Sequence, residues 1–110
     1  MPDYPVTPDG RYFVAKGRLW RRSDPALPEA ERKAAVRDLM AARRAVRDAA
    51  TKAETRAARD RVQAAKERLG ERGPVWWTDG APDETRKAPK NSTYADWWAG
   101  LDPDMRAIAG

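Results

Sequence analysis

The stretch AVRDAATKAETRAARD (residues 45–60) lies in the middle of the most helical part of this chain and decides whether that part is one helix or two. Apolar residues recur at steps of three and four on both sides of it, which is the period of an amphipathic helix. Within it, Thr51-Lys52-Ala53-Glu54 has the form of a capping box, which begins a new helix. We therefore expect an antiparallel αα-hairpin. A single helix of about forty residues is the alternative, because the apolar stripe keeps its phase throughout.

Proline and glycine mark the limits of this helical region. All nine prolines lie outside residues 29–73, and Gly70 is suited to end a helix. The apolar stripe between these limits is thin, because many of its members are Ala. It comprises Val36, Leu39, Met40, Val46, Ala50, Ala53, Ala57, Val62, Ala65 and Leu69. We expect Leu39 to face Ala65 and Val46 to face Ala57, with small side chains that let the helices approach closely.

The N-terminal arm, residues 1–28, has the pattern of a β-hairpin. Two short aromatic and β-branched runs, RYFVA (11–15) and RLWR (18–21), are separated by Lys16-Gly17. Lys-Gly is a weaker hairpin turn than Asn-Gly, because a residue other than glycine is disfavoured at positive φ. We expect this hairpin to need a covering element, since an isolated one is marginal in water.

The C-terminal arm, residues 71–110, carries four of the five tryptophans in two doublets. Its expected parts are a short strand at 75–77, a polar and mobile segment at 84–90, a short helix N-capped by Thr93 that includes Tyr94, Trp97, Trp98 and Leu101, and a frayed tail at 104–110. The helical hairpin lacks bulk of its own, so we expect the aromatic side chains of this arm to fold over it and complete its core.

Taken together, these patterns predict a mainly α protein of one small domain, residues 1–110. It comprises an antiparallel αα-hairpin (29–70), a short N-terminal β-hairpin (1–28) and a Trp-rich C-terminal arm (71–110) that ends in a short helix.

Composition excludes several kinds of chemistry. The chain has no Cys and no His, which removes disulfides, zinc fingers, thiol nucleophiles and Ser-His-Asp triads. We expect no metal, no cofactor and no catalytic residue. The first residues contain no apolar signal region and no window approaches a membrane span, so a cytoplasmic location is expected.

The leading functional hypothesis is a non-enzymatic protein-interaction or regulatory module, which binds another protein or itself. Trp and Arg are enriched among interface hot spots. The partner-binding candidates are Trp76, Trp77, Trp98, Arg43, Arg44 and Arg47. In a strand, Trp76 and Trp77 would point to opposite faces, so the outward one would be left as an exposed anchor.

Non-specific nucleic-acid binding is the alternative function. The net charge is +5, and residues 29–69 hold twelve basic and seven acidic side chains. The candidates for phosphate contact are Arg37, Arg43, Arg44 and Arg47. A third hypothesis, an enzyme that uses loop carboxylates, would need Asp79, Asp83 and Glu84, or Asp102 and Asp104, to converge.

Three blocks carry a resemblance to a known family. RYFVAKGRLWRRSDPALP (11–28), LGERGPVWWTDGAPD (69–83) and NSTYADWW (91–98) resemble a family of small bacterial proteins that has no known activity. The resemblance implies a bacterial cytosolic protein with the order hairpin, helices, Trp loop and short helix. It assigns no role to any residue.

Overall fold

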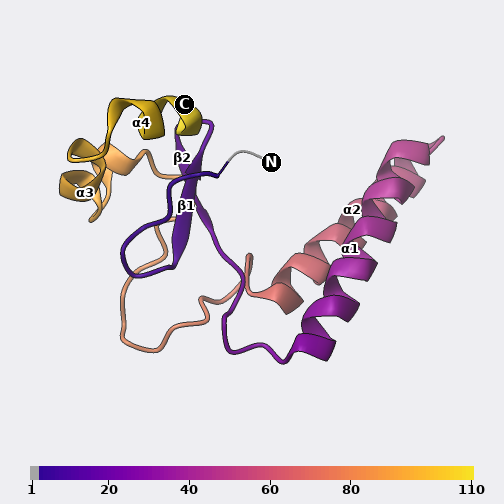
Figure 1. Ribbon diagram of the computed structural model, residues 1–110. Helices are drawn as coiled ribbons and strands as arrows, with labels where there is room; N and C mark the ends of the chain where they lie inside the picture. The colour runs from indigo at the N-terminus through magenta and orange to yellow at the C-terminus, as the bar shows by residue number, and fades with distance from the viewer. Residues whose placement is uncertain (1–2) are drawn as a thin grey trace. The chain divides into compact units, whose positions relative to one another are not determined.

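The computed structural model describes residues 3–110, which form two short strands and several helices in chain order (Figure 1). The elements are β1 (Tyr12–Ala15), β2 (Arg18–Arg21), α1 (Glu29–Asp48), α2 (Lys52–Leu69), the 3-10 helix η1 (Pro89–Asn91), α3 (Ala95–Ala99) and α4 (Pro103–Ala109). The prediction of a mainly α protein with an N-terminal β-hairpin and a long helical pair is confirmed. The contacts divide the chain into two compact units: Ser23–Trp76 is the helical unit, and the described residues before and after it form the β unit.

The helical unit is an antiparallel pair, with α1 and α2 side by side (Figure 1). The break falls where the capping box predicts it. The Thr51 hydroxyl accepts a hydrogen bond from the Glu54 backbone N–H at 3.1 Å, while the Glu54 carboxylate accepts one from the Ala50 N–H at 2.9 Å. At the other end of α2, Gly70 adopts φ 85°, the left-handed conformation that ends helices. The sequence therefore forms two helices and not one long rod.

Small residues line the seam between α1 and α2. Leu39 and Ala65 lie in one buried cluster with Ala35 and Leu69, as expected for facing positions. The second expected pair is wrong by one residue on α2. Ala57 is exposed and Ala58 is buried, because a shift of one position turns a side chain by about 100° around the helix.

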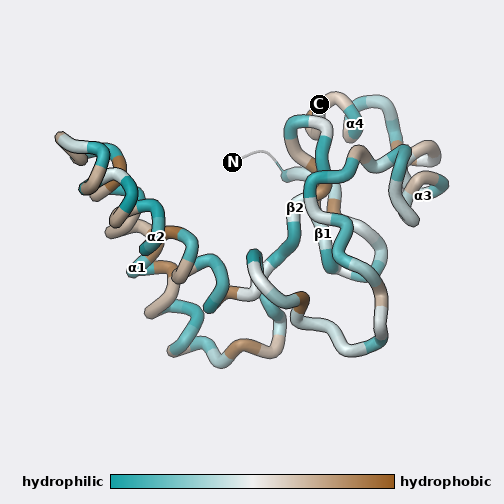
Figure 2. Tube along the Cα trace, turned by 180° about the vertical axis from the view of Figure 1, so that it is seen from behind, coloured by the Kyte–Doolittle hydropathy of each residue, from teal (hydrophilic) through white to brown (hydrophobic). Residues whose placement is uncertain are grey.

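Besides Ala57, four residues of the expected stripe are exposed: Val36, Met40, Ala50 and Ala53. Val36 is 41% exposed and Met40 is 38% exposed, whereas Ala35 and Ala42 take the seam positions. Figure 2 shows how few strongly hydrophobic positions α1 and α2 contain. Within residues 3–110, no helix combines the length and apolarity that crossing a membrane requires.

The β unit is built around the hairpin of β1 and β2, in which Phe13 pairs with Trp20 and Val14 with Leu19. Its turn residues both adopt positive φ, Lys16 at 54° and Gly17 at 73°. Such a turn matches the twist of the strands. The most deeply buried large side chains here, all at 0% exposure, are Tyr12, Val14 and Leu19.

The C-terminal arm differs from its prediction in several of its segments. Residues 75–77 form no strand. The tail forms α4, where the Asp102 carboxylate caps the Asp104 N–H at 2.8 Å and Ala109 is buried at 0% exposure. The buried backbone of the tail is hydrogen-bonded, since the Ala109 carbonyl accepts from the Gly17 N–H at 2.8 Å.

Glu84 is a buried residue in the segment 84–90, which was expected to be polar and mobile. It is 3% exposed, and its carboxylate accepts hydrogen bonds from the Thr93 N–H at 2.9 Å and the Thr93 hydroxyl at 2.6 Å. Thr93 is thereby engaged and does not cap α3, whose N-cap residue is Tyr94. A single buried carboxylate ties the loop to the start of the C-terminal helices.

The aromatic residues complete the core of the β unit, which corrects the prediction that they cover the helices. The Trp77 ring meets the Tyr12 ring edge-on at 5.7 Å, and Tyr94 meets Tyr12 at 5.6 Å. Trp97 extends this aromatic group at 6.5 Å from Tyr94. Trp76 alone of the first doublet belongs to the helical unit, where it packs close to Gly70.

Candidate functional site

The four arginines predicted to contact phosphate are all exposed on α1, but they do not share one face. The buried seam of α1 is marked by Ala35, Leu39 and Ala42. At about 100° per residue, Arg37 and Arg44 lie opposite this seam, whereas Arg43 and Arg47 lie on one flank, roughly a quarter turn away. The predicted cluster is therefore split, and only Arg43 and Arg47 flank the second helix.

The second helix adds cations to the same side. The seam of α2 is marked by the buried residues Ala58, Ala65 and Leu69. Three cations at intervals of seven residues lie on one flank of this seam: Lys52, Arg59 and Lys66. The opposite side of the pair is marked by the Asp38–Arg68 ion pair at 2.5 Å. We call the set Arg43, Arg47, Lys52, Arg59 and Lys66 the basic edge.

The electrostatics of Lys66 support this grouping. Burial lowers the pKa of its ammonium first, and the nearby cations Arg72 and Arg43 lower it further, while Glu71 opposes them. The influence of Arg43 on Lys66 joins the α1 and α2 members of the basic edge. Like charges here repel, and a bound anion would relieve that repulsion.

The basic edge is only weakly neutralised. In the part of the chain that the structure describes, Arg47 is its one member in an ion pair, with Asp48 at 2.9 Å. Both partners of this pair are exposed, and such pairs are worth little in water. The hydrogen bond from Arg47, followed by the charges of Arg47 and Arg44, lowers the pKa of Asp48.

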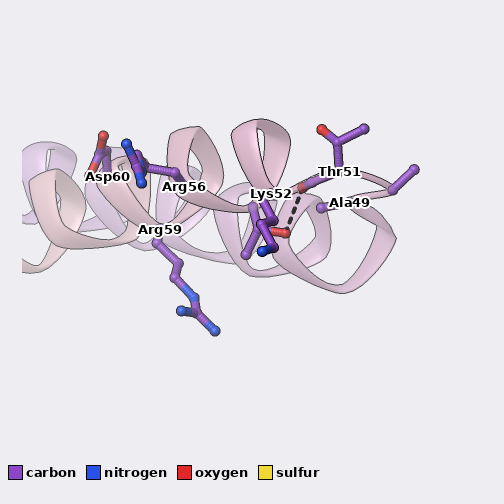
Figure 3. A pocket seen from close by; sticks show the side chains of 8 residues that line it. Ala49, Thr51, Lys52, Arg56, Arg59 and Asp60 are labelled. Carbon is purple, nitrogen blue, oxygen red and sulfur yellow. Dashed lines mark hydrogen bonds between the residues drawn. The ribbon is translucent and has the colours of Figure 1, made fainter.

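A polar hollow of about 600 Å³ lies where α1 turns into α2 (Figure 3). Lys52, Arg56 and Arg59 contribute cations to its lining, and Asp60 is its one acid. The dashed line in Figure 3 is the hydrogen bond from the Thr55 hydroxyl to the Thr51 carbonyl at 2.9 Å. Since Lys52 and Arg59 belong to both features, the hollow continues the basic edge to the tip of the helical pair.

The tryptophan candidates are placed differently from the prediction. Trp77 is 8% exposed, its indole N–H donates to the Ala81 carbonyl at 2.8 Å, and the Arg11 guanidinium lies 4.7 Å from its ring centre. It is a core residue and not an exposed anchor. Trp76 and Trp98 are half-buried.

The loop carboxylates serve local structure. Asp79 pairs with Arg11, and Asp83 accepts hydrogen bonds from the hydroxyl and backbone N–H of Thr85. Burial acts to raise the pKa of Asp83, but the hydrogen bonds from Thr85 and the charge of Arg21 outweigh it, so the pKa is lowered. Within residues 3–110, no three acidic side chains come together in a way that could hold a metal ion.

Sequence reasoning found Arg43 and Arg47 but missed Lys52, Arg59 and Lys66. The signal was available, because a spacing of seven places residues on one face of a helix. The edge becomes visible only when both helices are oriented by their seams. The three α2 residues would otherwise be taken as scattered surface charge.

Comparison with protein-family models, characterised proteins and solved structures gives no significant match. The resemblance to a family of small bacterial proteins therefore stays a prediction.

Proposed function

We propose that this chain is a non-enzymatic binding module whose basic edge binds the phosphate backbone of nucleic acid. The observation that carries this is the alignment of five cations from both helices on one side of the pair, with one exposed ion pair among them in the described residues. Phosphate contacts by Lys and Arg supply most of the affinity of non-specific nucleic-acid binding. The expected bacterial cytoplasmic setting is part of the same proposal.

The dimensions of the basic edge suit a linear polyanion. From Lys52 to Lys66 is fourteen residues of α2, which is roughly 21 Å along the helix axis at 1.5 Å per residue. A nucleic-acid strand presents a phosphate about every 3.4 Å of axis, so this length meets about six phosphates. The cations provide no pattern of base-reading amides, and the binding we propose is independent of sequence.

The test measures affinity for a fluorescently labelled 20-base-pair duplex by anisotropy. Reversing Arg43 and Arg59 to Glu should weaken binding by at least about tenfold, since each substitution removes one phosphate contact and adds repulsion. The matched control reverses Arg37 and Arg44, which carry the same charge on the side of α1 away from the seam. Equal loss in both double variants would show that only net charge matters and would remove the basic edge as the site.

A protein partner is the second candidate, favoured by two exposed apolar residues. Val36 and Met40 lie on the same flank of α1 as Arg43 and Arg47, at helical steps of four, three and four. Such a stripe suits an apolar groove with an acidic rim. Self-association through Val36 and Met40 is the other form of this candidate, and analytical ultracentrifugation of the wild type and Met40→Asp tests it. A concentration-dependent dimer lost in Met40→Asp supports this candidate, and a monomer at all concentrations removes self-association.

A further inference from the structure

The β unit contains a second basic hollow, separate from the basic edge. It has a volume of about 490 Å³ and lies beside the β1–β2 turn. Its lining residues come from two segments far apart in sequence: Lys16, Gly17, Arg18, Arg86, Lys87, Ala88 and Asn91. Four of these are cations and none is an acid.

Backbone hydrogen bonds hold the two segments together. The Arg86 N–H donates to the Leu19 carbonyl at 2.7 Å, and the Leu19 N–H donates to the Lys87 carbonyl at 2.9 Å. The Arg18 guanidinium donates to the Arg86 carbonyl at 2.8 Å, which fixes one of its nitrogens against the wall. The cations therefore lie on a rigid frame and not on loose loops.

The backbone conformation of this hollow is unusual. In residues 3–110, the residues other than glycine with positive φ are Lys16, at 54°, and Arg86, at 76°, and both line the hollow. Arg86 stands third in the turn closed by the Lys87 N–H and the Glu84 carbonyl, where glycine is favoured. Strain of this kind gathers at ligand sites. Cations occupy both positions where glycine or asparagine would fit better.

The charges of the hollow are incompletely neutralised. Lys87 lies 3.8 Å from the Glu84 carboxylate, which is already engaged by Thr93. In the described part of the chain, Lys16, Arg18 and Arg86 form no ion pair. Three of the four cations that line the hollow thus have no acidic partner among the described residues.

We propose that this hollow binds the phosphate group of a small phosphorylated molecule. Ammonium groups act as point charges for phosphate oxygens, and a guanidinium offers paired N–H donors. Asn91 also lines the hollow, and its side chain carries a neutral amide donor. The volume falls within the range of small-molecule sites, which favours a metabolite over a polymer. This proposal concerns the β unit and does not depend on nucleic-acid binding by the basic edge.

The test uses two variants that remove charge while suiting the backbone. Lys16→Asn creates an Asn-Gly turn and Arg86→Gly places glycine at the other positive φ, so both variants should fold. Binding of inorganic phosphate and of glucose 6-phosphate is measured by titration calorimetry at fixed ionic strength, with glucose as the probe that lacks phosphate. Each variant should weaken phosphate binding by at least about tenfold and raise the melting temperature of the unliganded protein by about 4 °C.

Lys90→Gln is the matched control, because Lys90 is exposed and close in sequence but does not line the hollow. Its affinity for phosphate should equal that of the wild type. Saturable binding of phosphate alone identifies a free-phosphate site, and binding of both probes identifies a phosphate-ester site. The proposal is overturned if neither probe shows saturable binding, or if Lys90→Gln loses as much affinity for phosphate as the two variants do. It is also overturned if Lys16→Asn weakens binding of a single-stranded oligonucleotide but leaves the affinity for phosphate unchanged.

Discussion

Removal of the buried Glu84 carboxylate should destabilise the β unit strongly. This side chain is 3% exposed and accepts two hydrogen bonds from Thr93, through the backbone N–H at 2.9 Å and the hydroxyl at 2.6 Å. Hydrogen bonds to charged groups contribute about 1.5–3 kcal/mol each, and water can replace part of this at Thr93, which is exposed. We expect Glu84→Ala to cost about 3 kcal/mol, which lowers the melting temperature by about 12 °C or more.

Urea unfolding followed by tryptophan fluorescence measures this cost, since four of the five tryptophans lie in the β unit. Glu84→Gln keeps one acceptor oxygen and should lose about 1 kcal/mol. The matched control is Asp96→Ala, which removes an exposed acid of α3 and should stay within about 0.5 kcal/mol of the wild type. If Glu84→Ala costs no more than Asp96→Ala, the argument that Glu84 ties the loop to the C-terminal helices is refuted.

Two further predictions concern a backbone position and an acidic group. Gly70→Ala should lower the free energy of unfolding by at least about 1 kcal/mol, because φ is 85° and the new Cβ would lie 3.1 Å from both Asp24 and Trp76. Thermal unfolding followed by circular dichroism measures this, and an unchanged midpoint would contradict it. Burial acts to raise the pKa of Asp9, but hydrogen bonds, including that from Tyr94, outweigh it and lower the pKa below 3.8. A lowered carboxyl pKa stabilises the fold above the unfolded value, and this contribution is lost as the pH falls through the folded value. Unfolding midpoints measured from pH 5 to pH 2 should therefore fall more steeply in the wild type than in Tyr94→Phe, and parallel curves would contradict the assignment.

Local signals in the sequence were sufficient for the helical pair. The capping interaction joins Glu54 to Thr51, three positions earlier, and to Ala50, four positions earlier, so it depends on neighbours along the chain. The β-hairpin is equally local, since its strands are joined by two residues. The helix phase was the uncertain part, because Ala57 and Ala58 are chemically identical and only packing distinguishes the exposed one from the buried one.

Contacts between distant segments could not be derived in the same way. Trp77 packs against Tyr12, sixty-five positions earlier, and no periodicity signals such a contact. Burial of Glu84 depends on Thr93, and a charged residue among turn residues is ordinarily exposed. The hollow that contains Lys16 and Arg86 likewise needs the backbone bonds at Leu19. In the sequence, the weak Lys16-Gly17 turn was the one feature that drew attention to this hollow.

The candidate nucleic-acid site could be predicted from the sequence only in part. Arg43 and Arg47 were found because they are one turn apart on a single helix. Arg37 and Arg44 were grouped with them by sequence proximity, although the helix turns them away. Lys66 enters the site only through the fold, which places it near Arg43.

The salt dependence of duplex binding tests the central claim most directly. With four to five phosphate contacts from the basic edge, the slope of log K against log salt concentration should lie between about −3.6 and −4.5, a loss of roughly 150- to 500-fold from 50 to 200 mM. Lys66→Gln should make the slope shallower by about 0.9, while Arg37→Gln should leave it unchanged. A slope near zero, or the same change in slope for both variants, would contradict binding of nucleic acid at the basic edge.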